Sequence, residues 1–265
     1  MKIEIRDLRL TYPTGLEALQ GISLTIEAGE QVAIVGQNGA GKTTLVRHFN
    51  GLLQPTAGSV LIGDWDTTGH SVSKLAARVG YVFQNPDEQL FSRNVETEVR
   101  FGPRNLGYSK EKVDELVQWA LSLTELRDKT ETNPYDLSPT WRKMVALASV
   151  IAMDTPIVIL DEPTTGQDAS NVARIATVIA KLREQGKTVV TITHDIDFCA
   201  ENFDRVIALS QGKVLLDGPA GNVLGQEEIL AETYVDPPQL TRLGKRLGLT
   251  ETVRNQEEFL NAMKK

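Results

Sequence analysis

The chain has 265 residues, of which 28 are lysine or arginine and 35 are aspartate or glutamate, so its formal net charge is −7. This length allows one substantial domain with an inserted or appended subdomain, and the longest apolar run, residues 144–153, is too short to cross a bilayer. The acidic balance argues against a broad basic surface, and we therefore expect no nucleic-acid partner.

In chain order, the first predicted elements are strands. Apolar residues alternate with polar ones over residues 3–10 and 22–26, and a β-branched run follows at 31–35. A helix is expected next, over residues 43–52, because a glycine near its end suits a helix C-terminus.

The pattern is helical only from about residue 84 to residue 154. Within it, residues 110–126 carry an apolar stripe at helical spacing. Strand-like runs resume at 157–160 and 189–192, with an amphipathic helix predicted between them at 168–185. Strands that alternate with helices predict a largely parallel α/β sheet, into which the helical block is inserted.

The end of the chain predicts a helical tail. A Pro-Pro pair at 237–238 precedes leucines at helical spacing, and Asn255 with Glu258 forms a capping-box pattern. We therefore expect an α/β domain over residues 1–225, with a helical subdomain inserted at about 84–154, and a C-terminal helical segment over 226–265.

Residues 36–43 read Gly-Gln-Asn-Gly-Ala-Gly-Lys-Thr, which matches the P-loop pattern of nucleotide-binding proteins. A predicted strand precedes it and a predicted helix follows, so backbone N–H groups and the helix N-terminus would bind phosphates. Lys42 would reach the β- and γ-phosphates and Thr43 would bind Mg²⁺; the alternative is a glycine-rich turn without function. The nucleotide-binding residues expected in this segment are Gly36, Gln37, Asn38, Gly39, Ala40, Gly41, Lys42, Thr43 and Thr44.

Two carboxylates follow the predicted strand at 157–160. This arrangement would place Asp161 beside the metal ion, while Glu162 would polarise an attacking water. A strand that ends in solvated acids is the alternative, and it is weaker in a chain that also contains a P-loop.

Together these motifs resemble those of the ABC ATPase family. Residues 161–168 are similar to its Walker B and D-loop region, 191–195 to its switch-histidine loop and 82–86 to its Q-loop. The resemblance implies an ATP-hydrolysing P-loop NTPase fold that uses ATP and Mg²⁺. Its implied catalytic residues are Glu162, His194 and Gln84, and its implied metal ligands are Thr43, Gln84 and Asp161. Tyr12 stands where the family stacks an aromatic ring on adenine, although a strand-end aromatic is as often core packing.

Within this family, residues 85–91, 101–107 and 237–243 resemble the ATP-binding subunits of energy-coupling-factor (ECF) importers for vitamins and transition metals. The resemblance implies a second ATPase subunit, a transmembrane coupling component and a substrate-binding membrane component. It also implies that the C-terminal helices pair the ATPase subunits and that Asp87 and Glu88 dock arginines of coupling helices. Helix capping explains the two acids equally well.

The expected location is the cytoplasmic face of the cell membrane, as a peripheral subunit. The first residues contain no long apolar stretch that would serve as a secretion signal. A single cysteine, Cys199, excludes an internal disulfide and fits a reducing compartment.

The chain departs from the family at the signature, which normally reads Leu-Ser-Gly-Gly-Gln. Residues 137–141 here read Leu-Ser-Pro-Thr-Trp. Ser138 keeps the hydroxyl that contacts the ATP of the opposite subunit in the family. Pro139 removes an N–H donor, and Thr140 and Trp141 add bulk.

The departure favours a heterodimer with a second ATPase that has a regular signature; a homodimer with a tolerated variant is the alternative. Two other functions stay open, a soluble ABC protein outside transport and an ATP-gated subunit with little turnover. The resemblance implies that a separate membrane protein selects the transported substrate.

Overall fold

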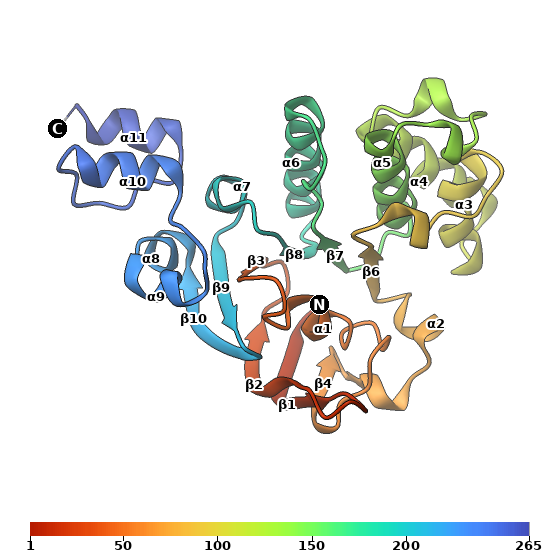
Figure 1. The fold of residues 1–265 in the computed structure, drawn as a ribbon. Helices are drawn as coiled ribbons and strands as arrows, with labels where there is room; N and C mark the ends of the chain where they lie inside the picture. Colours follow the sequence, from red (N-terminus) through yellow and green to blue (C-terminus); the bar gives the residue numbers. More distant parts are fainter. Residues whose placement is uncertain (265) are drawn as a thin grey trace.

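The computed structural model describes residues 1–264, and within them the strands form two sheets (Figure 1). A six-stranded sheet has the order β10-β9-β3-β8-β7-β6, and a four-stranded antiparallel sheet has the order β2-β1-β4-β5. The strands are β1 Ile3–Thr11, β2 Glu17–Ile26, β3 Gln31–Val35, β4 Ala57–Ile62, β5 Trp65–Asp66, β6 Val79–Val82, β7 Ile157–Asp161, β8 Thr188–Ile192, β9 Arg205–Ser210 and β10 Lys213–Pro219.

The helices cover the sheets and form two separate groups beyond them (Figure 1). The α-helices are α1 Lys42–Val46, α2 Val72–Leu75, α3 Val95–Asn105, α4 Lys110–Leu123, α5 Pro139–Ile151, α6 Ala169–Glu184, α7 Ile196–Asn202, α8 Ala220–Leu224, α9 Glu227–Glu232, α10 Gln239–Arg246 and α11 Gln256–Ala262. Short 3-10 turns are η1 Thr67–Gly69, η2 Pro86–Glu88, η3 Arg127–Lys129 and η4 Pro134–Asp136. Among the described residues, no helix combines the length and hydrophobicity that a membrane span requires.

The six-stranded sheet is parallel except at β10, which pairs antiparallel with β9. All residues of β3, β7 and β8 are buried, because helices and the second sheet cover both of its faces. This burial explains why these strands read as continuous apolar runs rather than as an alternation. The predicted strands at 31–35, 157–160 and 189–192 are therefore neighbours or near neighbours in one sheet.

Strand β1 contains a bulge that its apolar pattern reflects. The buried residues change from odd positions, Ile3 and Ile5, to even positions, Leu8 and Leu10, and the pairing with β2 shifts register between Ile5 and Leu8. Asp7 adopts a positive φ of 44° at this point. The backbone of β4 passes so close that a Cβ at Gly58 would lie 2.2 Å from the Asp7 carbonyl oxygen. Only glycine fits there.

The insertion expected at about 84–154 contains α3, α4 and α5, which pack on one another and against β6 (Figure 1). Helix α4 ends at Leu123, three residues before the predicted end at 126. The buried faces of these helices join one hydrophobic core with the sheet and α6.

The helix predicted over 43–52 is shorter than expected. Helix α1 ends at Val46, and the N–H groups of His48 and Phe49 bond three residues back instead of four, as in His48 N–H to Leu45 O at 3.2 Å. The ring of His48 lies with Nδ1 2.8 Å from the Thr44 carbonyl oxygen, which an α-helix would pair with the His48 N–H. A side chain thus competes for the helical acceptor, and the last turn tightens.

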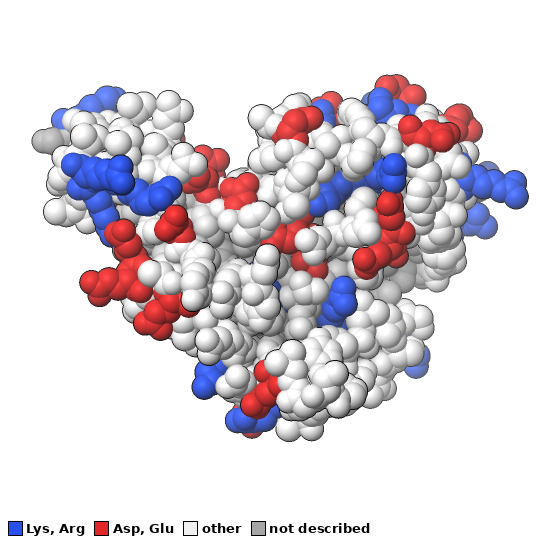
Figure 2. Space-filling model, viewed as in Figure 1, with Lys and Arg blue, Asp and Glu red and all other residues white. Residues whose placement is uncertain are grey.

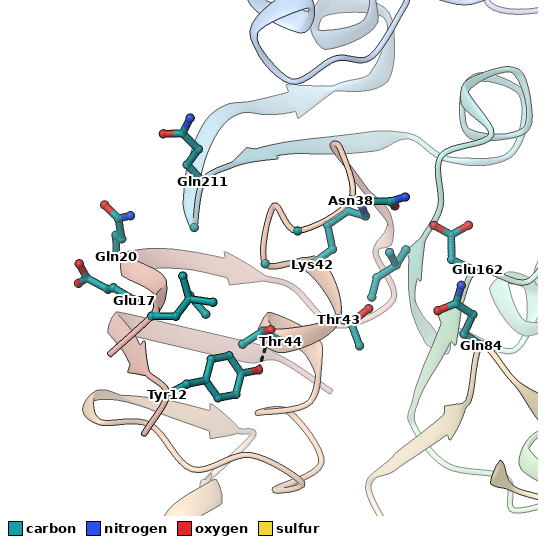
Figure 3. A pocket seen from close by; sticks show the side chains of 16 residues that line it. Tyr12, Glu17, Gln20, Asn38, Lys42, Thr43, Thr44, Gln84, Glu162 and Gln211 are labelled. Atoms are coloured by element: carbon teal, nitrogen blue, oxygen red, sulfur yellow. Dashed lines mark hydrogen bonds between the residues drawn. The ribbon is translucent and has the colours of Figure 1, made fainter. Parts of the chain in front are cut away.

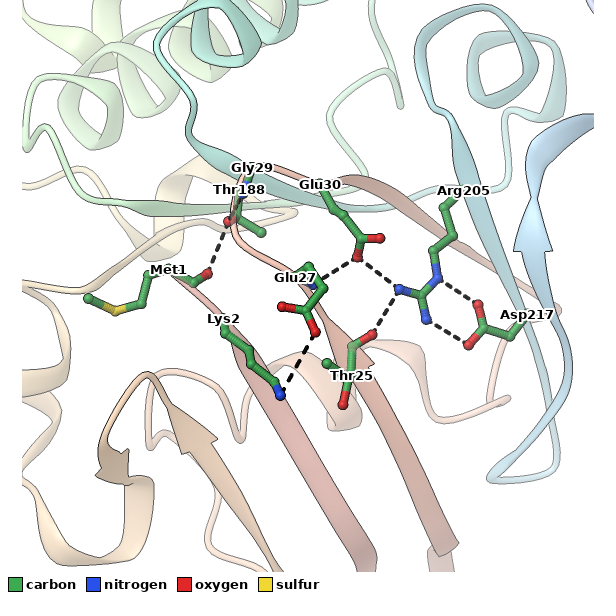
Figure 4. Close-up of polar contacts among 9 residues, drawn as sticks. All are labelled: Met1, Lys2, Thr25, Glu27, Gly29, Glu30, Thr188, Arg205 and Asp217. Atoms are coloured by element: carbon green, nitrogen blue, oxygen red, sulfur yellow. Dashed lines mark hydrogen bonds and ion pairs between the residues drawn. The ribbon is translucent and has the colours of Figure 1, made fainter.

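Polar contacts join the two sheets at the strand ends that lie away from the P-loop (Figure 4). The Arg205 guanidinium donates to Asp217 through two bonds of 2.7 Å, to Glu30 at 2.8 Å and to the Thr25 carbonyl at 2.8 Å. The Thr188 hydroxyl donates to the Met1 carbonyl at 3.1 Å. Residues of β2, β8, β9 and β10, together with Met1 just before β1, are thereby held together at one edge.

The C-terminal helices α10 and α11 lie beyond α8 and α9, away from the helical insertion (Figure 1). On the face drawn in Figure 2, basic side chains lie over these helices and acidic ones directly below them. The ion pair Lys245–Glu227, at 3.1 Å, joins α10 to α9. The Gln239 N–H at the start of α10 donates to Asp197 of α7 at 2.8 Å, so the tail is tied to the helix that follows β8.

Candidate functional site

The loop between β3 and α1 has a backbone that only glycine permits at several points. Gly36, Gly39 and Gly41 have φ values of 143°, 82° and 99°. A Cβ at Gly36 would lie 2.2 Å from the Leu209 carbonyl oxygen of β9, so this glycine is also required by close approach. The loop is therefore pressed against the sheet and wraps around the position of Lys42.

Lys42 is 7% exposed, and its ammonium group lies inside the loop. It donates to the carbonyl oxygens of Gly36 at 2.6 Å and Gln37 at 2.9 Å. Burial lowers the pKa of Lys42, while the nearby Glu162 and Asp161 oppose that shift. A cation held at this position is suited to bind the phosphate groups of an anionic ligand.

Asp161 ends β7 and is 2% exposed. The Tyr81 hydroxyl donates to its Oδ2 at 2.7 Å, and the Thr43 hydroxyl donates to its Oδ1 at 3.4 Å. Burial raises the pKa of Asp161, and these two hydrogen bonds oppose the shift. The Asp161 carboxylate and the Thr43 hydroxyl together offer the oxygen ligands that Mg²⁺ prefers. One or two protein oxygens are enough for Mg²⁺ when phosphate oxygens of the substrate complete its coordination shell.

Glu162 has a left-handed backbone, with φ of 50°, which is unusual for a residue other than glycine. Its N–H donates to the Ile192 carbonyl at 2.9 Å, and its Oε2 lies 2.8 Å from His194 Nδ1. The Thr165 hydroxyl donates to the same Oε2 at 3.1 Å. Strained backbone of this kind is frequent at functional sites. Here it turns the carboxylate toward the histidine that follows β8.

Lys42, Thr43 and Glu162 line a cavity of about 480 Å³ (Figure 3). His194 lines a neighbouring cavity of about 630 Å³, which shares Glu162 with the first. Tyr12 lies at one end of the first cavity, Lys42 and Thr43 in the middle, and Gln84 and Glu162 at the other end. The Tyr12 hydroxyl is 3.3 Å from the Thr44 hydroxyl, and its ring is half-buried against the core. The cavity thus has an aromatic ring, a cationic loop and a carboxylate in sequence along its length.

The structure does not bring every expected site residue into this cavity. Ser138 lies at the first turn of α5, where its hydroxyl accepts from the Trp141 N–H at 3.5 Å and lies 2.8 Å from the Thr140 hydroxyl. Asp87 and Glu88 are exposed in the turn η2, where the Asn85 side chain accepts from the Asp87 N–H. Asn85 therefore caps this turn, as the capping interpretation of the sequence predicts.

Two contacts around the signature differ from what the sequence suggests. The Trp141 indole packs against the core of its own chain, with Lys129 Nζ 4.5 Å and Arg174 Cζ 5.2 Å from its ring centre. Asp87 is already paired within the chain, because Arg142 Nη1 lies 2.9 Å from its Oδ1. The tryptophan adds less free bulk than expected, and a docking partner must compete for Asp87.

Sequence reasoning missed two residues of the site. Tyr81 is 7% exposed in β6 and orients Asp161, while Lys143 is 4% exposed in α5 and donates to the Glu162 carbonyl at 2.6 Å. Neither belongs to a motif. The one available signal was that Lys143 directly precedes the apolar run at 144–153, where a helix would bury it, and a buried lysine requires a partner.

Comparison with known proteins finds similarity to ATP-binding proteins of ABC transporters. A model of the ABC transporter family matches residues 19–165. A putative ABC transporter ATP-binding protein of Pyrococcus furiosus is 41% identical over 98% of this chain and 99% of its own length. The energy-coupling factor transporter ATP-binding protein EcfA of Methanoculleus marisnigri is 39% identical over 92% of this chain and 89% of its own length. A putative ABC transporter ATP-binding protein of Methanosarcina acetivorans is 40% identical over 97% of this chain, which spans only 43% of that relative's length.

Solved structures share the fold. The structure of cbiO1 from Clostridium perfringens, part of the ABC transporter complex cbiONQ, has a TM-score of 0.76 and 34% identity, covering 93% of this chain and 98% of that one. A dimeric ATP-binding cassette in a post-hydrolysis state with ADP and phosphate has a TM-score of 0.75 and 29% identity, covering 82% of this chain and 98% of its own. These likenesses confirm the fold class expected from the sequence.

Proposed function

The chain belongs to the ABC transporter family of ATPase subunits, and from that premise we propose that it binds and hydrolyses MgATP to energise an ECF-type importer. The observation that carries the proposal is the cavity lined by the P-loop residues Lys42 and Thr43 and by Glu162. Asp161 accepts a hydrogen bond from Thr43, and His194 lies 2.8 Å from Glu162, so both adjoin this cavity. Tyr12 would stack on adenine, and residues 36–44 would hold the phosphates. The order of these residues along the cavity suits this arrangement, with the γ-phosphate nearest Glu162.

Glu162 would act as general base toward the attacking water. Its Oε2 is held by His194 and Thr165, so its direction is fixed before the substrate binds. Lys42, His194 and Gln84 would position the phosphates and the water. Thr43, Asp161 and Gln84 would hold Mg²⁺, which when bound neutralises charge on the phosphates.

The active form would be a head-to-tail dimer in which Ser138 of one subunit faces the ATP of the other. The dimeric cassette among the structural neighbours supports this arrangement. In the proposed division, residues 1–225 form the ATPase domain, with the helical subdomain at about 84–154, and residues 226–265 pair the subunits. Exposed Leu243 and Leu260 on the C-terminal helices support a pairing role.

A transmembrane coupling component would bind beside the helical insertion, and a separate membrane component would bind a vitamin or a transition metal. The names EcfA and cbiO1 among the similar proteins support this importer class. A cavity of about 230 Å³ beside η2 is bordered by the exposed side chains of Leu52, Val72, Phe91 and Phe101. A coupling helix would insert apolar residues there and present a basic residue to Asp87 or Glu88. The subunit would then lie at the cytoplasmic face of the membrane.

A second candidate is an ATP-gated subunit with little turnover of its own, which the altered signature at 137–141 favours. The same purified protein distinguishes the two. We expect Lys42→Ala to lose most MgATP binding and Glu162→Gln to bind MgATP but hydrolyse it at least about a hundredfold more slowly. Glu184→Gln, which changes an exposed carboxylate of α6, serves as the control.

Unchanged affinity and turnover in Lys42→Ala would refute the assignment of the nucleotide site. Wild-type turnover in Glu162→Gln would exclude Glu162 as the base. A wild-type chain that binds MgATP without measurable turnover, alone and with a partner ATPase, would favour the gated subunit. Co-purification from native membranes, with identification of the bound membrane proteins, tests the importer class.

A further inference from the structure

Helix α5 carries a second buried ammonium group at the site, separate from the P-loop lysine. Lys143 is 4% exposed, and the eight residues that follow it in the helix are all buried. Its Nζ donates to the carbonyl oxygens of Glu162, at 2.6 Å, and Thr165, at 3.1 Å. A buried cation is costly unless hydrogen-bonded, so these two carbonyls are what allow a lysine at this position.

Both acceptors belong to the segment that sets the direction of the Glu162 carboxylate. Glu162 has a left-handed backbone, which persists only where the surroundings hold it. Its N–H is fixed by β8, through the Ile192 carbonyl, and its C=O is fixed by Lys143. With both ends of the residue held, the side chain reaches His194 and the Thr165 hydroxyl.

Lys143 lies on the same helix, α5, as the signature residue Ser138. It lies five residues after Ser138, the N-cap of the same helix, which corresponds to about 7.5 Å along a rigid helix. Helix α5 therefore connects the residue expected to face a partner's ATP with the backbone of the residue expected to activate water in its own site.

We propose that Lys143 is a positioning residue for Glu162, which couples the signature end of helix α5 to the direction of the Glu162 carboxylate. The inference rests on the proposed function, in which Glu162 is the general base. Lys143 contacts no P-loop residue in the hydrogen bonds of the described structure, so it acts on the hydrolysis step and not on ATP binding.

The test is a double-mutant cycle between Lys143→Met and Glu162→Gln, with kcat, KM and MgATP affinity measured for each protein. Methionine keeps most of the side-chain volume and removes the ammonium. Because a displacement of about 1 Å costs on the order of a hundredfold in rate, we expect kcat to fall by about that factor, with KM and affinity within about twofold of wild type. In the Glu162→Gln background, single-turnover hydrolysis should show no further loss from Lys143→Met, because the residue acts through Glu162.

A second variant, Lys143→Gln, is made in parallel because the glutamine amide keeps an N–H donor. Whichever variant retains wild-type MgATP affinity is used in the double-mutant cycle. Lys187→Met is the control, because Lys187 is also largely buried and also donates to a carbonyl, that of Asp154, at the far end of the sheet, in addition to its ion pair with the Asp154 carboxylate. The control should keep kcat within about twofold.

Multiplicative losses in the double mutant, or an unchanged kcat in Lys143→Met, would overturn the inference. Either outcome would leave the proposed function standing if Glu162→Gln alone slows hydrolysis. A wild-type protein that does not hydrolyse MgATP, alone or with a partner ATPase, would overturn both.

Discussion

Replacing Tyr81 with phenylalanine removes one hydroxyl from the buried network around Asp161. The hydroxyl donates to Asp161 Oδ2 at 2.7 Å, and the two residues are 7% and 2% exposed. Burial and the neighbouring Asp161 carboxylate raise the pKa of Tyr81 above its ordinary value, so its hydroxyl is a proton donor at neutral pH. The substitution therefore deletes a hydrogen bond to a charged group without changing the charge of the site.

The size of the effect follows from what else holds Asp161. A hydrogen bond to a charged group contributes about 1.5–3 kcal/mol to stability. The other side-chain donor, the Thr43 hydroxyl, lies at 3.4 Å and compensates little. We therefore expect the free energy of unfolding to fall by about 2–3 kcal/mol. If Asp161 holds Mg²⁺, the loss of its orienting partner should also raise the Mg²⁺ concentration needed for half-maximal ATPase activity by about 10-fold to 100-fold.

Urea unfolding followed by tryptophan fluorescence measures the first effect, and Mg²⁺ titration of ATPase activity measures the second. Tyr108→Phe is the matched control, because that hydroxyl donates to the Met153 carbonyl at 3.4 Å on an exposed residue of the helical insertion. It should change stability by less than about 0.5 kcal/mol. An unfolding midpoint and a Mg²⁺ requirement equal to wild type in Tyr81→Phe would refute the role given to this hydroxyl.

Three further perturbations test other parts of the molecule. Restoring Gly-Gly-Gln at positions 139–141 returns one backbone N–H donor to the signature. If the altered signature limits hydrolysis, the ATPase turnover of the chain alone should rise by about a hundredfold. Unchanged turnover, with no gain from a candidate partner ATPase, would show that no second ATPase is needed. Replacing Asp87 and Glu88 with Asn and Gln should uncouple transport from ATP turnover in reconstituted vesicles while the isolated chain stays folded, and unimpaired transport would leave capping and local pairing as their whole role. Arg205→Met leaves the half-buried carboxylates of Glu30 and Asp217 without their shared cation. The free energy of unfolding should fall by about 2 kcal/mol, which is less than for a fully buried ion pair because both carboxylates reach solvent. An unshifted midpoint in urea unfolding would contradict this.

The parts of the site that local sequence encodes could be predicted. The P-loop is one continuous segment whose glycines meet positive φ values, and Asp161 and Glu162 directly follow a buried strand. Each depends on neighbours in sequence, so the pattern contains the information. Strands 205–210 and 213–219 were not predicted, although they complete the sheet. Strand β10 is only partly buried, and its short run before a Pro-Gly-rich segment has no clear period.

Contacts between segments far apart in the chain could not be predicted. Tyr81 and Asp161 are joined by a side-chain bond across 80 positions, and Asp87 and Arg142 by one across 55. The shortened helix α1 depends on which way the His48 ring turns. Such choices are settled by packing in three dimensions, to which hydrophobic periodicity is insensitive.

The placement of β3 has a consequence for how this chain matures during its synthesis. The strand that leads into the phosphate loop is complete at residue 35, yet its two neighbours in the sheet are residues 188–192 and 205–210. A nascent chain therefore carries the loop through the synthesis of residues 36–187 without the strands that support it, and the Leu209 carbonyl that lies against Gly36 arrives later still. Nucleotide has no structured loop to stabilise before then. Ribosome-bound chains stalled before residue 188 should be cleaved by protease equally fast with and without ATP, whereas chains that expose residue 210 should gain protection.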